Sequence, residues 1–328
     1  MTSSAASPVK KVEIAVVIPV YRAEGVLNEL CRRLDAVLTP LGEYRIVLVD
    51  DRSPDSSWSV IKSLAAANPR IIGIRLSRNF GQHYAITAGL RATSAEWTIV
   101  MDCDLEDPPE AIPELIACGK NGNDIVLALR KRRTHNPLKI AASRLFYRLF
   151  ILLSGIHLDS RVGTFRALRF PVVQAFNRME ETFRLFGAMV GWLGFSVGYV
   201  DVVHGTRFDG KSNYNLHKLF RLALDGMISF SNRPLYLAVI LGSVMSLLSL
   251  TYVVYLLLRY LIMGPIPIIG WLSTVIVTAF IGGMVLLNLG IIGLYIGRIY
   301  DQTKGRPLFV IDEIVGAARK DDSASILN

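Results

Sequence analysis

An acidic run, Asp102 to Glu110 with the sequence DCDLEDPPE, holds the residues of this chain that are best suited to chemistry. Asp102 and Asp104 stand one residue apart after an apolar run, so both carboxylates can face one ligand where a strand gives way to a loop. Hard divalent cations such as Mg²⁺ or Mn²⁺ prefer oxygen donors and keep open positions for a substrate diphosphate. The pair therefore predicts a metal site, in which the ion neutralises a diphosphate and stabilises it as a leaving group.

Short apolar or β-branched runs precede this motif and the other polar clusters of the N-terminal half. They occupy 12–18, 44–50, 71–76, 97–101 and 125–129, and stretches with helical periodicity separate them. This alternation predicts an α/β domain, a mostly parallel sheet with helices on both faces. Ligands bind at the carboxyl ends of the strands in such sheets. We therefore expect the residues after the runs, among them Tyr21, Asp51 and Asp102, to converge on one edge.

Two uncharged stretches, 235–258 and 266–296, account for much of the mean hydropathy of +0.40. At about 1.5 Å rise per residue, each is long enough as a helix to cross a hydrocarbon core of about 30 Å. The sequence thus predicts a transmembrane hairpin over 233–298, with spans at about 235–258 and 268–292. A buried core helix is the alternative for each stretch.

Basic residues crowd the outer ends of this hairpin: Lys218, Arg221 and Arg233 before it, and Arg298, Lys304 and Arg306 after it. The positive-inside rule then places both ends in the cytoplasm. The first residues lack the apolar core of a signal peptide. We expect a multi-pass protein of the inner (plasma) membrane, with the catalytic domain and both termini cytoplasmic and with its three cysteines reduced.

The remaining layout follows from composition. We expect a disordered N-terminus over 1–11, a catalytic domain over 12–213 and a cytoplasmic tail over 299–328. Basic amphipathic helices at about 137–154 and 214–232 are predicted to lie in the lipid headgroup region; the alternative is that their apolar stripes pack against the catalytic domain. A net charge of +9 could suit nucleic acid, but no base-stacking module or DNA-reading motif is present, so no nucleic-acid partner is expected.

The segment HGTRFDGKS, 204–212, contains the GxxxxGKS pattern of a nucleotide-binding P-loop. A P-loop opens a parallel sheet, and too little chain follows to supply the flanking strands and the second metal-binding Asp. A basic loop with glycine can instead close over a phosphate, because Arg offers a bidentate fork and Lys a point charge.

The series VVIPVYRAE, VDDRSPDSS, LSRNFGQHYAITAGL and MDCDLEDPPE resembles the successive signatures of the family 2 inverting glycosyltransferases of GT-A (Rossmann-like) fold. With the C-terminal hairpin, the chain resembles the polyprenyl-phosphate branch of that family, which includes bactoprenol glucosyltransferases and is related to dolichyl-phosphate mannose synthase. The match runs from residue 12 to about 313. The resemblance implies transfer of a hexose, glucose from UDP-glucose, to undecaprenyl phosphate in the modification of a cell-envelope glycan such as lipopolysaccharide.

The resemblance also implies roles for single residues. Nucleotide contacts fall to Pro19, Tyr21, Glu24, Asp51 and Asp102, and metal contacts to Asp102 and Asp104, of which Asp104 is the more direct ligand. The segment LDSRVGTFRAL supplies Asp159 and Arg166, and the family's R-x-x-G-x-S-x-Y pattern supplies Arg207, Ser212 and Tyr214. Asn213 stands where the family usually has Lys, and Lys211 precedes the Ser, so which amine reaches the phosphate stays open.

A phosphate monoester, with its second pKa near 6, is largely dianionic at neutral pH and needs little help from a base. Our hypothesis is that Asp159 orients the acceptor or the sugar, or stabilises charge at the anomeric carbon, and that Arg130, Arg207 and Lys211 bind the incoming phosphate. Asp159, Asp104 and Arg207 are the predicted catalytic residues, and Arg130, Arg166, Lys211, Ser212 and Tyr214 the predicted phosphate and acceptor contacts.

Other functions stay open at this point. A processive polysaccharide synthase would carry a QxxRW motif, which is missing, and a wider channel than two spans offer. A noncatalytic glycolipid-binding or flippase-partner protein would not need the acidic motifs. The transferred sugar could instead be mannose, N-acetylhexosamine or aminoarabinose. The family includes homotetramers, so a homo-oligomer is expected, and the tail RPLFVIDEIVG could add an edge strand to a neighbouring copy.

Overall fold

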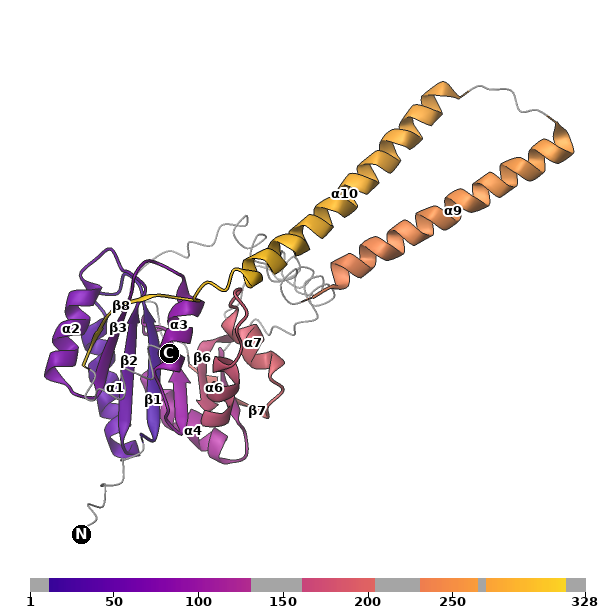
Figure 1. The fold of residues 1–328 in the computed structure, drawn as a ribbon. Coiled ribbons are helices and arrows are strands. Elements are labelled where there is room, and N and C mark those ends of the chain that lie inside the picture. Colours follow the sequence, from indigo (N-terminus) through magenta and orange to yellow (C-terminus); the bar gives the residue numbers. More distant parts are fainter. Residues whose placement is uncertain (1–11, 131–160, 204–230, 265–269, 317–328) are drawn as a thin grey trace, which may run out of the picture. The chain divides into compact units, whose positions relative to one another are not determined.

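The structure, a computed structural model, describes residues 12–130, 161–203, 231–264 and 270–316. The chain divides into two compact units. The first is made of Met1–Asn136, His157–Asn213 and Pro307–Asn328, and the second of Pro137–Ile156 and Tyr214–Arg306. The first unit contains the sheet and the second contains the two long helices, and each is described by itself (Figure 1).

An eight-stranded sheet forms the described part of the first unit, in the order β7-β5-β6-β4-β1-β2-β3-β8. The strands are β1 (Ile14–Val20), β2 (Tyr44–Asp50), β3 (Ile71–Leu76), β4 (Trp97–Val100), β5 (Ile125–Arg130), β6 (Val162–Arg169), β7 (Val197–Val202) and β8 (Ile311–Val315). β4, β1, β2 and β3 run parallel, as do β5 and β7, whereas β6 and β8 are antiparallel to their neighbours. The predicted mostly parallel sheet is confirmed.

Helices cover both faces of this sheet, as predicted. They are α1 (Leu27–Leu38), α2 (Ser57–Ala67), α3 (Gln82–Arg91), α4 (Ile112–Lys120), α6 (Phe170–Asn177) and α7 (Phe186–Trp192), with short 3-10 turns at Thr39–Leu41 and Pro109–Ala111. Every side chain of β1 is buried, as a central parallel strand requires. Val16 and Ile18 belong to the core formed with α1, α2 and α4, whereas Val17 faces α3 at Gly89.

The C-terminal strand pairs within its own chain. The sequence left open that the segment RPLFVIDEIVG could add an edge strand to a neighbouring copy; in the structure β8 pairs antiparallel with β3 of the same chain, with Gly73 opposite Val315 and Arg75 opposite Glu313. The amide of Ser77 also donates to the carbonyl of Val310 at 2.9 Å. The edge of the described sheet next to β3 is therefore covered by the chain's own tail.

Two long apolar helices, α9 (Arg233–Met263) and α10 (Trp271–Thr303), make up the described part of the second unit. Their mean hydropathies are 2.2 and 2.4, and none of the most apolar window of either helix is buried inside the protein. Core helices of a soluble protein would be mostly buried, so the two helices are candidate membrane spans. The second helix begins at Trp271, slightly later than expected, and continues as one helix to Thr303, well past the predicted end of the span at 292.

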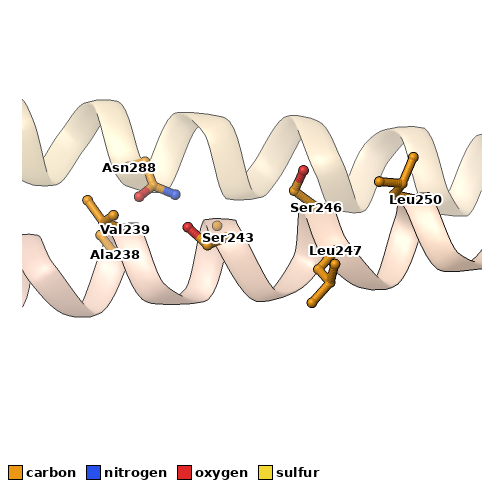
Figure 2. A pocket seen from close by; sticks show the side chains of 8 residues that line it. Ala238, Val239, Ser243, Ser246, Leu247, Leu250 and Asn288 are labelled. Carbon is orange, nitrogen blue, oxygen red and sulfur yellow. The ribbon is translucent and has the colours of Figure 1, made fainter.

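The two helices meet within their own unit at polar as well as apolar positions. The hydroxyl of Tyr295 in α10 donates to the carbonyl of Ser231, just before α9, at 2.7 Å. Ser243 and Asn288 lie on the facing sides of α9 and α10, beside an open cavity of about 630 Å³ that Gly242 and Ser246 also line (Figure 2). Asn288 already donates to the carbonyl of Met284 in its own helix at 2.8 Å.

Candidate active site

Three turns lie at the same edge of the sheet, because β4, β1 and β2 are adjacent and parallel. Tyr21 follows β1, Asp51 follows β2, and Asp102 and Asp104 follow β4. A backbone hydrogen bond from Tyr21 to the Cys103 sulfur connects the first turn with the acidic motif. The structure thus brings together the side chains that the sequence series singled out; their individual roles stay predictions.

Backbone strain marks these same turns. Arg22, Arg52 and Leu105 have φ angles of 55°, 56° and 59°, and they are the only non-glycine residues with positive φ in the described part of the chain. Each directly follows one of the predicted site residues Tyr21, Asp51 and Asp104. A left-handed conformation of this kind costs about 1–3 kcal/mol and persists where surrounding contacts fix it, most often at functional sites. The strain therefore points to this edge independently of any motif.

Asp51 fixes the start of α3. Its two carboxylate oxygens accept hydrogen bonds from the backbone amides of Phe80, at 2.7 Å, and Gly81, at 2.8 Å. Burial raises the pKa of Asp51, although these two amides act in the opposite direction. Each carboxylate oxygen has a second lone pair, so this contact leaves Asp51 able to accept from a ligand. The sequence predicted a nucleotide contact here but not the structural one.

The preceding residue, Asp50, is completely buried and structural. It accepts a hydrogen bond from the amide of Ser53 at 3.1 Å and lies 3.5 Å from Nε of Arg75. Burial raises the pKa of Asp50, while the hydrogen bonds to Ser53 and the Arg75 charge act against this effect. Asp50 therefore braces the loop that presents Asp51.

The turn after β1 is bound to the loop after β2. The amides of Arg22 and Glu24 donate to the side chains of Ser53, at 3.2 Å, and Asp55, at 3.3 Å. In return Glu24 accepts from the amide of Ser56 at 2.8 Å, so this predicted nucleotide contact also holds the two turns together. Pro19 lies buried within β1, whereas the ring of Tyr21 is 45% exposed and open to a flat partner such as a base.

The two acidic side chains of the DxD motif are partly exposed and already oriented. Asp102 accepts a hydrogen bond from Nε2 of Gln82 at 2.6 Å, and Asp104 accepts one from the amide of Glu106 at 3.1 Å. Burial raises the pKa of Cys103, between them, to about 12, so this thiol stays protonated and is a poor metal ligand.

Two carboxylates are a sparse donor set for a metal. Within the ranges that the structure describes, no group of three or more His, Cys, Asp or Glu side chains could hold an ion. Mg²⁺ is commonly bound by one or two carboxylates together with substrate phosphates and water. Asp102 and Asp104 fit such an ion, one whose remaining ligands arrive with a diphosphate.

A buried arginine adjoins Asp102. Arg166 of β6 is 5% exposed, and its guanidinium donates to the carbonyls of Gly163, at 2.7 Å, and Thr164, at 3.2 Å. It also lies over the ring of Phe186, 4.7 Å from the centroid. Burial lowers the pKa of Arg166 to about 10, and the Asp102 charge opposes this shift. A cation this well fixed beside the acidic motif is suited to an anionic ligand.

Gln82 and His83, in the first turn of α3, were missed by the sequence reasoning. Burial, and then the Arg166 charge, lower the pKa of His83 to about 4, so its ring is neutral at physiological pH. Its buried Nδ1 has no hydrogen-bond partner among the described residues. Both residues lie in the segment LSRNFGQHYAITAGL, one of the four signatures on which the family resemblance rests.

The remaining predicted residues are placed only in part. Arg130 ends β5 opposite Val202 of β7, at the same edge as the acidic motif because β5 and β4 both run antiparallel to β6. Asp159, Arg207, Lys211, Ser212 and Tyr214 lie outside the described residues, as do the predicted interface helix at about 137–154 and nearly all of that at 214–232.

The chain is similar to known glycosyltransferases. The model of the family "Glycosyl transferase family 2" matches residues 15–176. The chain is 34% identical to a bactoprenol glucosyl transferase of Shigella phage SfII, over 91% of this chain and 97% of that protein. It is also 34% identical to an undecaprenyl-phosphate 4-deoxy-4-formamido-L-arabinose transferase of Edwardsiella ictaluri, over 94% and 96%.

One similar solved structure is glucosyl-3-phosphoglycerate synthase of Mycobacterium tuberculosis in complex with Mn²⁺, UDP-glucose and phosphoglyceric acid. The similarity covers 66% of this chain and 78% of that protein, with a TM-score of 0.47 and 17% sequence identity. The family model covers β1 to β6 and with them the turns that carry Tyr21, Asp51, Asp102 and Asp104. Since two named transferases, each 34% identical, also match more than nine-tenths of this chain, the protein is a glycosyltransferase and belongs to glycosyl transferase family 2.

Proposed function

We propose that this protein transfers a hexose from a nucleotide sugar to a polyprenyl phosphate at the surface of a membrane. The observation that carries the proposal is the presence, in one chain, of the acidic sheet edge of a glycosyltransferase and of two exposed apolar helices of membrane-spanning length. Relatives whose names specify bactoprenol or undecaprenyl phosphate match this combination over almost their whole length.

The donor is a nucleotide sugar, and UDP-glucose is our first choice. The exposed ring of Tyr21 and the carboxylate of Asp51 border the same edge, so a base can stack on the first and donate a hydrogen bond to the second. Pro19 and Glu24 shape the turn between them. Asp102 and Asp104 would hold Mg²⁺ or Mn²⁺, which supplies charge neutralisation to the diphosphate leaving group.

The chain's own cations complete the reaction site. Arg166 keeps further N–H donors beyond the two that its carbonyl partners use, and its position beside Asp102 suits a diphosphate oxygen. The acceptor phosphate needs little activation, because its second pKa is near 6. Arg130, Arg207 and Lys211, with Ser212 and Tyr214, hold this phosphate in line with the departing diphosphate, and attack then inverts the anomeric carbon.

Asp159 acts in this scheme as an orienting or charge-stabilising group rather than as an obligatory base. Asp159→Asn should then reduce turnover while the affinity for UDP in the presence of Mn²⁺ stays nearly the same. An Asp159→Asn protein with wild-type turnover would remove this residue from the mechanism.

The decisive experiment is a screen of donors with the purified full-length protein, undecaprenyl phosphate and Mn²⁺, with the glycolipid identified by mass. UDP-glucose, GDP-mannose, a UDP-N-acetylhexosamine and a UDP-aminoarabinose separate the sugars that the relatives leave open. Formation of one glycolipid supports the proposal and names the sugar. Binding of polyprenyl phosphate without transfer from any donor would instead favour a noncatalytic glycolipid-binding or flippase-partner protein.

The proposed location is the inner (plasma) membrane. The protein crosses it twice, with the catalytic domain and both termini in the cytoplasm. Ile262, at the end of α9, and Asp301, near the end of α10, are both exposed. In intact spheroplasts, a membrane-impermeant maleimide should label Ile262→Cys and spare Asp301→Cys. The reverse pattern would invert the topology. Light scattering of the same detergent-solubilised protein tests the proposed homo-oligomer, a tetramer.

A further inference from the structure

We propose that β8, the strand that follows the second membrane helix, is a positioning element of the donor site and that Asp312 and Glu313 are its positioning residues. The strand contacts the segment that presents Asp51 at two points, Arg52 in the loop after β2 and Trp58 at the start of α2. The inference rests on the proposed function in that it takes the site to bind a nucleotide.

The strand is fitted closely to the sheet. Gly73 of β3 lies opposite Val315, and a Cβ at this position would come 2.4 Å from Ile61 Cγ2 and 2.8 Å from Val315 Cγ2. Gly316 ends the strand with φ +79°, and a Cβ there would be 2.2 Å from the carbonyl oxygen of Ile71. Only glycine allows the strand to approach so closely at these two points.

Asp312 contacts the strained residue of the loop. Its carboxylate lies 2.5 Å from the guanidinium of Arg52, across 260 residues of sequence. Arg52 directly follows Asp51 and has φ 56°. An arginine has little intrinsic preference for that conformation, so it needs an external contact to hold it. Asp312 supplies this contact from the tail.

Glu313 contacts the start of α2, the helix that follows the loop. It accepts a hydrogen bond from Nε1 of Trp58, which is 4% exposed, at 2.9 Å. The guanidinium of Arg75 lies 5.7 Å from the centre of the Trp58 ring, and its Nε is 3.5 Å from the buried carboxylate of Asp50. Glu313 therefore fixes the tryptophan against which the partner of Asp50 is placed.

The residues that support the Asp51 loop come late in the sequence. β8 begins at Ile311, only a short distance after α10 ends at Thr303. The loop at Asp51 is therefore completed by residues that follow the membrane helices in sequence. The site reaches its final geometry when the tail has returned to the sheet, and an isolated segment of the N-terminal domain would bind donor less tightly than the full chain.

The test compares Asp312→Asn with Asp301→Asn in the full-length protein. Both are exposed acids in an ion pair, but Asp301 of α10 pairs with Lys304, the residue that follows its own helix. We expect Asp312→Asn to raise the dissociation constant of UDP with Mn²⁺ and the donor KM by about two- to fivefold, the range open to an exposed ion pair, with kcat unchanged. Asp301→Asn should change neither constant.

Two further variants separate positioning from general stability. Exchange of the charges in Arg52→Asp/Asp312→Arg should restore most of the UDP affinity, since it rebuilds the ion pair and Asp adopts positive φ more readily than Arg. Glu313→Gln, which keeps an acceptor for Trp58, should be milder than Glu313→Ala. Amide hydrogen exchange of the peptide spanning 50–58 should quicken in Asp312→Asn, while peptides from α4 stay as in the wild type.

The two hypotheses fail in different ways. A wild-type protein that binds no nucleotide would refute the proposed function and the donor-site role of β8 with it. A wild type that binds UDP, together with an Asp312→Asn variant that matches Asp301→Asn in both affinity and exchange, would refute the role of β8 alone. An equal fall in kcat and in donor affinity would also count against positioning.

Discussion

Replacing Gly89 with alanine should lift α3 from the sheet and weaken the site at the other end of that helix. A Cβ at Gly89 would lie 2.3 Å from Val17 Cγ1 and 3.2 Å from Val49 Cγ2, both on fully buried strand residues. Carbon atoms in favourable contact are about 3.5–4.0 Å apart, so the helix must move by about 1 Å or more. At the start of α3, the backbone amide of Gly81 donates a hydrogen bond to Asp51, and the side-chain Nε2 of Gln82 donates one to Asp102.

The expected magnitude follows from two opposing effects. Overpacking of a buried site costs about 1–3 kcal/mol, and an overlap this deep belongs at the upper end. Alanine is the better helix former by about 1 kcal/mol, which offsets part of this cost. The net loss is about 2 kcal/mol in the free energy of unfolding. For a domain of about 150–250 residues, this corresponds to a fall in Tm of about 4–8 °C.

The assay is thermal unfolding of the detergent-solubilised protein at one scan rate, followed by tryptophan fluorescence, together with the donor KM. Gly25→Ala is the matched control, because nothing lies within 4 Å of a Cβ there. Val17→Ala removes the atom that clashes, so the double variant Gly89→Ala/Val17→Ala should lose less than the sum of the single losses, by about 1 kcal/mol. A Gly89→Ala protein as stable as the wild type, or strictly additive losses, would show that α3 is not seated in this way.

Three further predictions concern ionisable side chains. Asp104→Asn should reduce kcat/KM by about 10²-fold or more, because it removes charge stabilisation of several kcal/mol. The control Glu114→Gln, on the exposed face of α4, should keep the wild-type kcat/KM. Equal activities of the two variants in the transfer assay would contradict this prediction. Because the pKa of His83 is lowered from 6.5 to about 4, the unfolded chain binds more protons as pH falls below 6.5. Stability should therefore be fully present above that pH and decline toward pH 4, and His83→Gln should flatten the decline in Tm between about pH 7 and about pH 5. Burial raises the thiol pKa of Cys31 and of Cys103 to about 12, so iodoacetamide at about pH 8 should leave both unlabelled by mass spectrometry until the protein is unfolded.

The strands could be located from sequence because their signal is local. β2 and β3 begin and end where the apolar runs predict, and β1 is displaced by two residues, from 12–18 to Ile14–Val20. The order of the strands is not local. β6 lies between β4 and β5 and is antiparallel to both, and β8 returns to β3 from beyond the membrane helices. Such pairings depend on contacts between distant residues, which periodicity does not encode.

The candidate site shows the same division. Asp51, Asp102 and Asp104 could be named from sequence because acids at strand ends carry a chemical signal. Gln82 and His83 carry none by themselves. What distinguishes His83 is its burial beside Arg166, whose guanidinium lies over the ring of Phe186. Arg166 and Phe186 both come from segments far beyond His83 in the sequence. A residue whose environment is assembled from distant segments becomes visible only in the folded protein.

The strain at this edge explains why those distant contacts matter. Arg22, Arg52 and Leu105 each adopt a costly conformation beside a predicted ligand-binding residue, and a different contact stabilises each one. The amide of Arg22 is held by Ser53, the guanidinium of Arg52 by Asp312, and Leu105 by burial in the core at 9% exposure. A site whose turns are fixed before the donor arrives loses less conformational entropy on binding and presents its dipoles already oriented. The folding energy of the sheet and its tail thus supports the geometry that the transfer reaction requires.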